Sequence, residues 1–551
     1  ANTTADSNTG IGFNSLAANT TGANNTAIGE ASLGANTTGH SNLGVGVSSL
    51  GSNTSGEENT ACGRSSLFAN TTGDQNTALG RLALNANTTA SNNTAIGYNS
   101  LALNTTGTNN TSVGSDSLKS NTTADDNTAL GRSALFANTT GASNTGIGRL
   151  ALNANTTASN NTAVGKSALA ANTTGSENTA IGGAALDANT TGTQNVAVGQ
   201  NALTANTTAG NNTACGKSSL QGNTTGTSNT AVGQGSLANN TTADNNTAVG
   251  RNALNLNTTG SENTAVGLNA LKANTTGTFS TAMGRSALEA NTTGIRNNAF
   301  GYGALDANTT GDFNCAFGYA SLGQNTTADD NTAYGNKSLE DNTTGQYNTA
   351  VGSLALRDNT TADQNTAVGY IALGANTTGV ENTAVGYQAL DACTTGHDNT
   401  AIGRDSLGDL TTGTKNSALG VAGASVSTGS NNSFIGYNAG SSASPSGTIT
   451  TGSDNIVLGD NGISNLFCAD TSISSSDSRD KTDVTSFNIG LAWIEALRPV
   501  TYRWDRRTWY GTDAEPYGTP DGSKKRARLH LGFLAQEALE VEKANGYGTS
   551  N

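Results

Sequence analysis

A unit of 17 residues, with the consensus NTAxGxxxLxANTTGxx, recurs in register from Asn8 to Asn416. We number the places of the unit from its first Asn. Place four holds an apolar residue, place five a Gly and place nine a Leu in all 24 units. A unit this short cannot bury a core by itself, so successive copies must stack on one another. The repeat therefore predicts a solenoid with one unit per rung.

The rung is predicted to be β-structure. Asn, Thr and Gly dominate it, and its apolar places fit neither an α-helical stripe nor one alternating strand. We expect one short strand around NTAxG, a corner after the Gly, a second strand through the Leu and a return turn at NTTGxx. Places four and nine should then line the core of an all-β, parallel β-solenoid. The Leu column should form an internal ladder, represented by Leu33, Leu101, Leu203, Leu271 and Leu373.

The Asn residues of stacked units are also expected to line up. Aligned side-chain amides can hydrogen-bond from rung to rung along the fibre axis. The NTT triplets match the acceptor pattern for N-glycosylation as well. We prefer the ladder interpretation, because it explains the triplets without any modification.

Composition argues against several classes of function. The formal net charge is −14 and belongs wholly to the residues before Ser476, and such an acidic shaft disfavours nucleic acids and anionic membranes as partners. No run is apolar enough to span a membrane, and the first residues are already repeat sequence without a signal peptide. We expect Cys62 and Cys215, which fill place four, to be small buried hydrophobes. The His residues lie far apart, so no metal site and no cofactor are expected.

Two apolar places per rung make a thin core for one chain. We therefore expect a homotrimer in which three chains share a core, with a monomeric solenoid that polymerises end to end as the alternative. Phe300, Phe317 and Tyr334 occupy place four and should thicken the core locally. Tyr302 and Tyr319 lie two places further on and could form an exposed ladder that stacks on a sugar.

The repeat invites a comparison with known fibres. Its NTAIGxxSL segments resemble the repeat of trimeric autotransporter adhesin heads, in which three chains form parallel β-rolls around a common axis. Runs such as NTAVGYQAL, at 382–390, resemble the long shafts of phage and bacterial tail-fibre-like proteins. The resemblance implies a structural or adhesive fibre, on a virion or a cell surface, that binds a glycan or protein receptor and its own assembly partners.

The C-terminal sequence carries three motifs in a fixed order: SDSRDK at 476–481, LAWIEALRPVTYRW at 491–504 and HLGFLAQE at 530–537. They resemble the intramolecular chaperone auto-processing domain of phage tailspikes and tail fibres, the endosialidase-type self-cleaving peptidase family. The resemblance implies that Ser476 is the nucleophile, Lys481 its base and the Ser475–Ser476 bond the site of cleavage. The remaining motif residues are Asp477, Arg479, Gly532, Phe533, Ala535, Gln536 and Glu537.

This chemistry is sound for a single-turnover peptidase. A Ser hydroxyl needs a proton acceptor near neutral pH, and a Lys can serve when burial lowers its pKa. Only 14 residues follow Glu537, whereas the family domain continues beyond this motif, so we expect a truncated domain. Helices are predicted over 489–497 and 534–543.

The expected organisation is a regular shaft over 1–420, irregular rungs and a linker over 421–475, and a small α+β chaperone domain over 476–551. The alternative function makes self-processing and chaperoning the principal activity, with the shaft as its client.

Overall fold

The computed structural model describes residues 4–465, 496–503, 519–524, 527, 530–532 and 534–544. The chain divides into two compact units, Ala1–Ser464 and Asn465–Asn551. The first unit holds the repeats and the second the C-terminal motifs.

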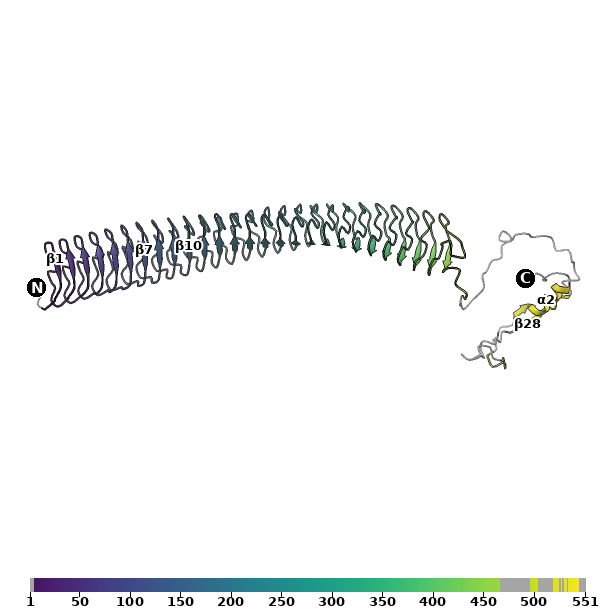
Figure 1. Ribbon diagram of the computed structural model, residues 1–551, viewed down its shortest axis with the longest axis horizontal. Coiled ribbons are helices and arrows are strands. Elements are labelled where there is room, and N and C mark those ends of the chain that lie inside the picture. The colour runs from purple at the N-terminus through teal and green to yellow at the C-terminus, as the bar shows by residue number, and fades with distance from the viewer. Residues whose placement is uncertain are drawn as a thin grey trace. The chain divides into compact units, whose positions relative to one another are not determined.

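The first unit is a parallel β-solenoid, whose rungs stack into a long, gently curved rod (Figure 1). Within residues 4–465 a single sheet contains 27 strands of three residues each. Strands β1 (Thr9–Ile11) to β25 (Ser417–Leu419) occupy places two to four of successive units, every 17 residues, and are followed by β26 (Ser433–Ile435) and β27 (Ile456–Leu458). Each strand pairs in parallel with the next in identical register, as in Thr9 with Thr26. The predicted solenoid with one unit per rung is confirmed.

The strand turns place three inward and place four outward, which corrects the predicted core. In β2 (Thr26–Ile28) Ala27 is fully buried, whereas Ile28 is 39% exposed. Successive side chains of a strand point to opposite faces, so only one of these two places can face the core. The core takes the small Ala at place three, and the larger apolar side chain at place four lies outside.

Two further expectations fall with this reversal. Cys62 and Cys215 are exposed in the single chain, not buried. Phe300 and Phe317 are only half-buried and Tyr334 is 58% exposed, so these rings do not thicken the core.

The Leu column lies inside, but not on a second strand. The representative side chains are fully buried: Leu33, Leu101, Leu203, Leu271 and Leu373. Their backbone is in the left-handed region, with φ +51° at Leu203, and so is place seven of each rung, with φ +58° at Asn201. Two left-handed residues so close together prevent an extended strand. The predicted second strand is therefore wrong: the return half of the rung is a series of turns.

The return half is nevertheless hydrogen-bonded to both neighbouring rungs. Leu33 N donates to Ser49 O at 3.0 Å in the following rung, and Ala31 N donates to Phe13 O at 2.9 Å in the preceding one. The backbone polar groups of the turns are thus paired along the stack, as buried backbone groups require.

Two Asn ladders complete the core. At place twelve, Asn36 Nδ2 donates to Asn19 Oδ1 of the preceding rung at 2.9 Å and to Gly39 O of its own rung at 2.9 Å. At place one, Asn25 Nδ2 donates to the same Gly39 O at 2.8 Å, and Asn25 N donates to Asn8 Oδ1 at 2.9 Å. Both columns are buried, so the Asn of the NTT triplets serves the predicted ladder.

The Gly at place five makes the corner and brings adjacent rungs together. Gly29 has φ +130°, and a Cβ atom there would lie 2.6 Å from Gly46 O of the next rung. A side chain would clash with that carbonyl and strain the backbone, which explains why the place never varies.

The solenoid continues past the regular repeat. Between Asn416 and Asn432 the rung has 16 residues, and between Asn432 and Asn455 it has 23, yet the place-one ladder is kept through Asn432 Nδ2 to Asn416 Oδ1 at 3.0 Å. Phe434 takes the inward place three and is fully buried. The last rungs therefore have a thicker core than the regular ones.

Candidate functional site

The second unit holds the C-terminal motif on a strand pair and a helix. Strand β28 (Val500–Tyr502) pairs antiparallel with β29 (His530–Gly532), and helix α2 covers Ala535–Ala544. Gly532 thus ends β29, while Ala535, Gln536 and Glu537 begin α2. The helix predicted over 534–543 is present with its start shifted by one residue. Phe533 lies outside the described residues, as does most of the helix predicted over 489–497.

An ion pair joins the motif residue Glu537 to Arg498, two residues before β28. Arg498 Nε donates to Glu537 Oε2 at 3.1 Å, and Arg498 Nη2 donates to Glu537 Oε1. The hydrogen bond from Arg498 lowers the pKa of Glu537, and the same bond raises the pKa of Arg498. A carboxylate in the first turn of a helix also complements the helix dipole. Glu537 therefore has a structural role, because it connects the start of α2 to the chain entering β28.

The proposed catalytic residues have no described geometry. Ser475, Ser476, Asp477, Arg479 and Lys481 all lie outside the described residues. The dyad therefore stays a prediction from the sequence motif.

On the shaft, the expected Tyr pair forms a stack on the outer surface. The rings of Tyr302 and Tyr319 lie 5.4 Å apart at an interplanar angle of 9°, with the residues 49% and 50% exposed. Arg285 lies over the Tyr302 ring, with Cζ 5.5 Å from its centroid. A second pair, Tyr370 and Tyr387, stacks at 5.6 Å. Sequence reasoning missed this second pair, although both of its members occupy place six.

A neighbouring aromatic column runs along place four. The rings of Phe300 and Phe317 stack at 4.3 Å, and those of Phe317 and Tyr334 at 5.2 Å. Each ring meets the one on the next rung, because the register aligns identical places.

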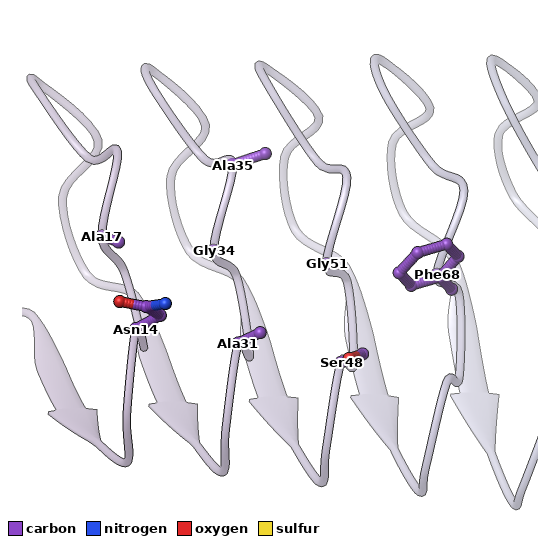
Figure 2. A pocket seen from close by; sticks show the side chains of 8 residues that line it. All are labelled: Asn14, Ala17, Ala31, Gly34, Ala35, Ser48, Gly51 and Phe68. Carbon is purple, nitrogen blue, oxygen red and sulfur yellow. The ribbon is translucent and has the colours of Figure 1, made fainter.

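The return half of the first rungs carries a shallow hollow of about 410 Å³. Figure 2 shows that small side chains and glycines from successive rungs form its floor, while the Phe68 ring stands at one side. Its lining contains no titratable group; the residues are Asn14, Ala17, Ala31, Gly34, Ala35, Ser48, Gly51 and Phe68. The hollow therefore offers contact surface and no acid–base chemistry.

The described residues hold neither a metal-binding cluster nor a membrane-spanning helix. In that part of the chain, no three His, Cys, Asp or Glu side chains are grouped as a metal site would require. Of the helices that the structure describes, none has the length and apolar character needed to cross a bilayer.

Comparison with known proteins identifies the C-terminal segment. Residues 476–547 match the family model described as the chaperone of endosialidase. No curated protein matches the chain. The match begins at Ser476 and includes β28, β29 and α2. The chain therefore joins a parallel β-solenoid of 17-residue rungs to a C-terminal segment that matches the chaperone-of-endosialidase family.

Proposed function

We propose that the protein is the shaft of a homotrimeric extracellular or virion fibre of the tail-fibre type, whose C-terminal cassette assists assembly and then cuts itself off. The observation that carries this proposal is the order of the two units. An unbroken stack of 27 strands precedes a segment matching the chaperone of endosialidase. Parallel stacking of long β-structures folds slowly, because distant parts of different chains must first be aligned. A folding helper at the end of such a shaft meets that need.

The self-cleavage step follows from the motif residues. Lys481, in its neutral form, takes the proton from the Ser476 hydroxyl, and Ser476 Oγ attacks the carbonyl carbon of Ser475. The new Oγ–C ester bond forms as the C–N bond between Ser475 and Ser476 breaks, and the freed amine takes up the proton. Water then hydrolyses the ester, releasing residues 476–551. Glu537, paired with Arg498, supports the fold of the cassette.

The test is the mass of the expressed chain. We expect the unmutated protein to release a C-terminal fragment of 76 residues, and Ser476→Ala and Lys481→Ala each to leave the chain whole. Combining the two changes should add nothing, because nucleophile and base act as a unit. Ser478→Ala, two residues away in the same motif, is the matched control and should still be cut. Cleavage that persists in Ser476→Ala would refute the assignment.

Timing offers a second check on the same proposal. A Ser and a Lys in an unassembled chain lack the fixed geometry that the reaction needs, so cutting should follow oligomer formation. Native mass spectrometry over a refolding time course measures both events. Cleavage of monomers would instead favour self-processing as the principal activity. A monomer that grows into open-ended polymers would favour the alternative assembly, a monomeric solenoid that polymerises end to end.

The stacked tyrosines favour an adhesive role as a second candidate function. Two parallel rings on consecutive rungs present a flat aromatic surface, to which the apolar face of a sugar ring can bind. Glycan-array binding should then fall with Tyr302→Ala and Tyr319→Ala. Tyr98→Ala is the control, because Tyr98 occupies the same place without a stacked Tyr on the next rung. Equal binding by all three variants would remove this candidate.

A further inference from the structure

The outward face of the sheet is an apolar column with no partner in the single chain. All 27 strands end in an apolar residue, from Ile11 to Leu458, and these side chains point away from the core. Several are more than a third exposed: Ile28, Ile96, Leu130, Ile181, Val232, Val249 and Ile402. A continuous apolar surface of this length is typical of a protein interface.

Opposite charges border this column on its two sides. We call the residue at place six, just after the corner Gly, the trailing flank, and the two residues just before the first Asn of a rung the leading flank. In the first 25 rungs the trailing flank carries one acid, Glu30, and nine bases: Arg64, Arg81, Arg132, Arg149, Lys166, Lys217, Arg251, Arg285 and Arg404. The leading flank carries two bases, Arg296 and Lys415, and 15 acids, the first Asp6 and the last Asp398.

The leading acids have in part an internal role. Asp125 Oδ1 accepts a hydrogen bond from Thr108 N of the preceding rung, and Asp312 Oδ1 accepts one from Ile295 N at 2.8 Å. This role explains an acceptor at the first of the two leading places, but not the acids at the second, such as Asp126 and Asp330. The trailing bases are all exposed, and the ion pairs of the described residues include only one of them, Arg404 with Asp405.

The two flanks distinguish between ways of packing apolar faces together. A second copy related by rotation about the fibre axis brings its leading flank against the trailing flank of the first, so acid meets base. A copy that runs in the opposite direction brings base against base and acid against acid. Like charges across an interface disfavour the wrong arrangement. Rotation about one axis also generates closed rings from such two-sided contacts.

We propose that the place-four columns of parallel copies of this chain pack around a common axis, with the trailing flank of each copy against the leading flank of the next, rung beside rung. This interface rests on the proposed homotrimeric fibre and defines which surface of the chain holds the trimer together.

The charges along the sequence agree with a register that places each rung beside the same rung of the next copy. No regular rung carries the same sign on both flanks, and the two leading bases occur on rungs whose trailing residues are Tyr302 and Val421. Tyr302 then lies at the edge of the interface, so glycan binding there and tight packing at that rung compete.

The native Cys62 provides the first test. It occupies place four near one end of the shaft, so copies of Cys62 meet only if the chains are parallel and in register. In a full-length chain with the other cysteines replaced by Ser, a short bis-maleimide should link Cys62 of one copy to Cys62 of another. The control carries Phe68→Cys in place of Cys62, on the return half of the same rung, and should not be linked. Linking of the control, or none at Cys62 in an oligomer, would overturn the interface.

Charge reversal gives the second test. One full-length variant replaces three trailing bases by Glu: Arg64, Arg132 and Arg404. Another also replaces by Arg the leading acids of the same rungs: Glu58, Asp126 and Asp398. We expect the first variant to weaken the oligomer about tenfold or more at low salt, with a smaller effect in high salt, and the second to restore it to within about twofold.

Asp187→Arg, at place ten of the return half, is the matched control and should leave the oligomeric state unchanged. The oligomeric state by native mass spectrometry is the readout. If the first variant keeps its oligomer, or if the second variant fails to restore it, the proposed interface is wrong while the fibre proposal still stands. A monomer of the unmutated chain at all concentrations would overturn both.

Discussion

Replacing Asn206 by Cys should show how much the place-twelve ladder contributes to stability. Asn206 Nδ2 donates to Asn189 Oδ1 at 2.9 Å and to Ala209 O at 3.0 Å, and Asn206 Oδ1 accepts from Asn223 Nδ2 at 3.0 Å. The substitution has a natural counterpart at Cys393, which stands at place twelve four rungs before the end of the sheet. There the ladder stops, and Asn376 Oδ1 on the rung before it is buried without a hydrogen-bond partner.

The magnitude follows from counting which groups lose their partners. Ala209 O keeps the bond from Asn195 Nδ2 at 2.9 Å, and Asn223 Nδ2 keeps Gly226 O at 2.9 Å. Asn189 Oδ1 is left buried and unpaired, which costs about 1–3 kcal/mol, and loss of the bond from Asn223 Nδ2 costs about 0.5–1.5 kcal/mol more. We therefore expect local destabilisation of about 3 kcal/mol.

The reverse change should do very little. In Cys393→Asn the new amide can donate to Asn376 Oδ1 and Gly396 O, but its own oxygen then meets Leu410, which holds place twelve on the next rung. The unpaired acceptor moves by one rung instead of disappearing. The Cys393 thiol already contacts Gly396 O at 3.6 Å, so the net gain is one hydrogen bond while one orphan is kept, and we expect a change within about 1 kcal/mol.

Hydrogen exchange is the suitable assay, because a long repeat array does not unfold in two states. A local loss of 3 kcal/mol should speed exchange of the backbone amides in the rungs around Asn206 about 100-fold and leave distant rungs unchanged. Thr191→Cys, at an exposed place of the neighbouring rung, is the control and should leave exchange as it was. Unchanged exchange in Asn206→Cys would show that the ladder follows the fold without stabilising it.

Three other substitutions test the core, the turns and the buried thiol. Leu203→Asp should unfold several rungs, since Leu203 is fully buried and an unpaired carboxylate there costs several kcal/mol. Val232→Asp, on the outer column, should instead weaken the oligomer and leave the rung folded. Circular dichroism detects the first effect and native mass spectrometry the second. Ile371→Asn should raise the thermal midpoint by relieving about 1 kcal/mol of strain, because Ile371 is β-branched and has φ +56°. Asn201→Ser, at the same place of another rung, should not raise the thermal midpoint. Burial raises the pKa of the Cys393 thiol to about 11 from 9.0, so ionisation of this thiol favours the unfolded chain. The stability that is present below pH 9 should therefore fall by about 2–3 kcal/mol as the pH rises to 11. Cys393→Ala should abolish this loss, as measured by alkaline denaturation. A flat profile in the unmutated chain would contradict the burial of that thiol.

The repeat period was enough to predict the architecture, but not which side of the strand faces inward. A three-residue strand such as Thr26–Ile28 has a single inward place, and either Ala27 or Ile28 could fill it. The return half lies close to place three, because a Cβ atom at Gly44 would lie 3.5 Å from Leu33 Cδ1; the small Ala27 therefore faces inward, and the larger side chain is left outside. Nothing within one unit records that choice, because it depends on the distance between the two halves.

The turns of the return half were hidden for another reason. Asn201 and its equivalents at place seven are often Asn, Ser or Asp, which tolerate the left-handed region, and this was a usable signal. Leu203 gave no such signal, because burial of the Leu column overrides the cost of its positive φ. In the cassette, motif order predicts Ser476 and Lys481 as the nucleophile and its base, but it does not specify how the two side chains approach each other.

The identical contacts above and below each rung have an evolutionary consequence. Gly29 meets Gly46 as every other corner Gly meets the next, and the place-twelve Asn ladder passes in the same way through the regular rungs as far as Asn376. Recombination between tandem copies can therefore add or remove whole rungs without exposing a mismatched surface. The length of the solenoid becomes a heritable quantity that changes in steps of one strand spacing, about 4.8 Å. Lineages that share every contact of the rung can thus differ in how far apart the solenoid holds its two ends.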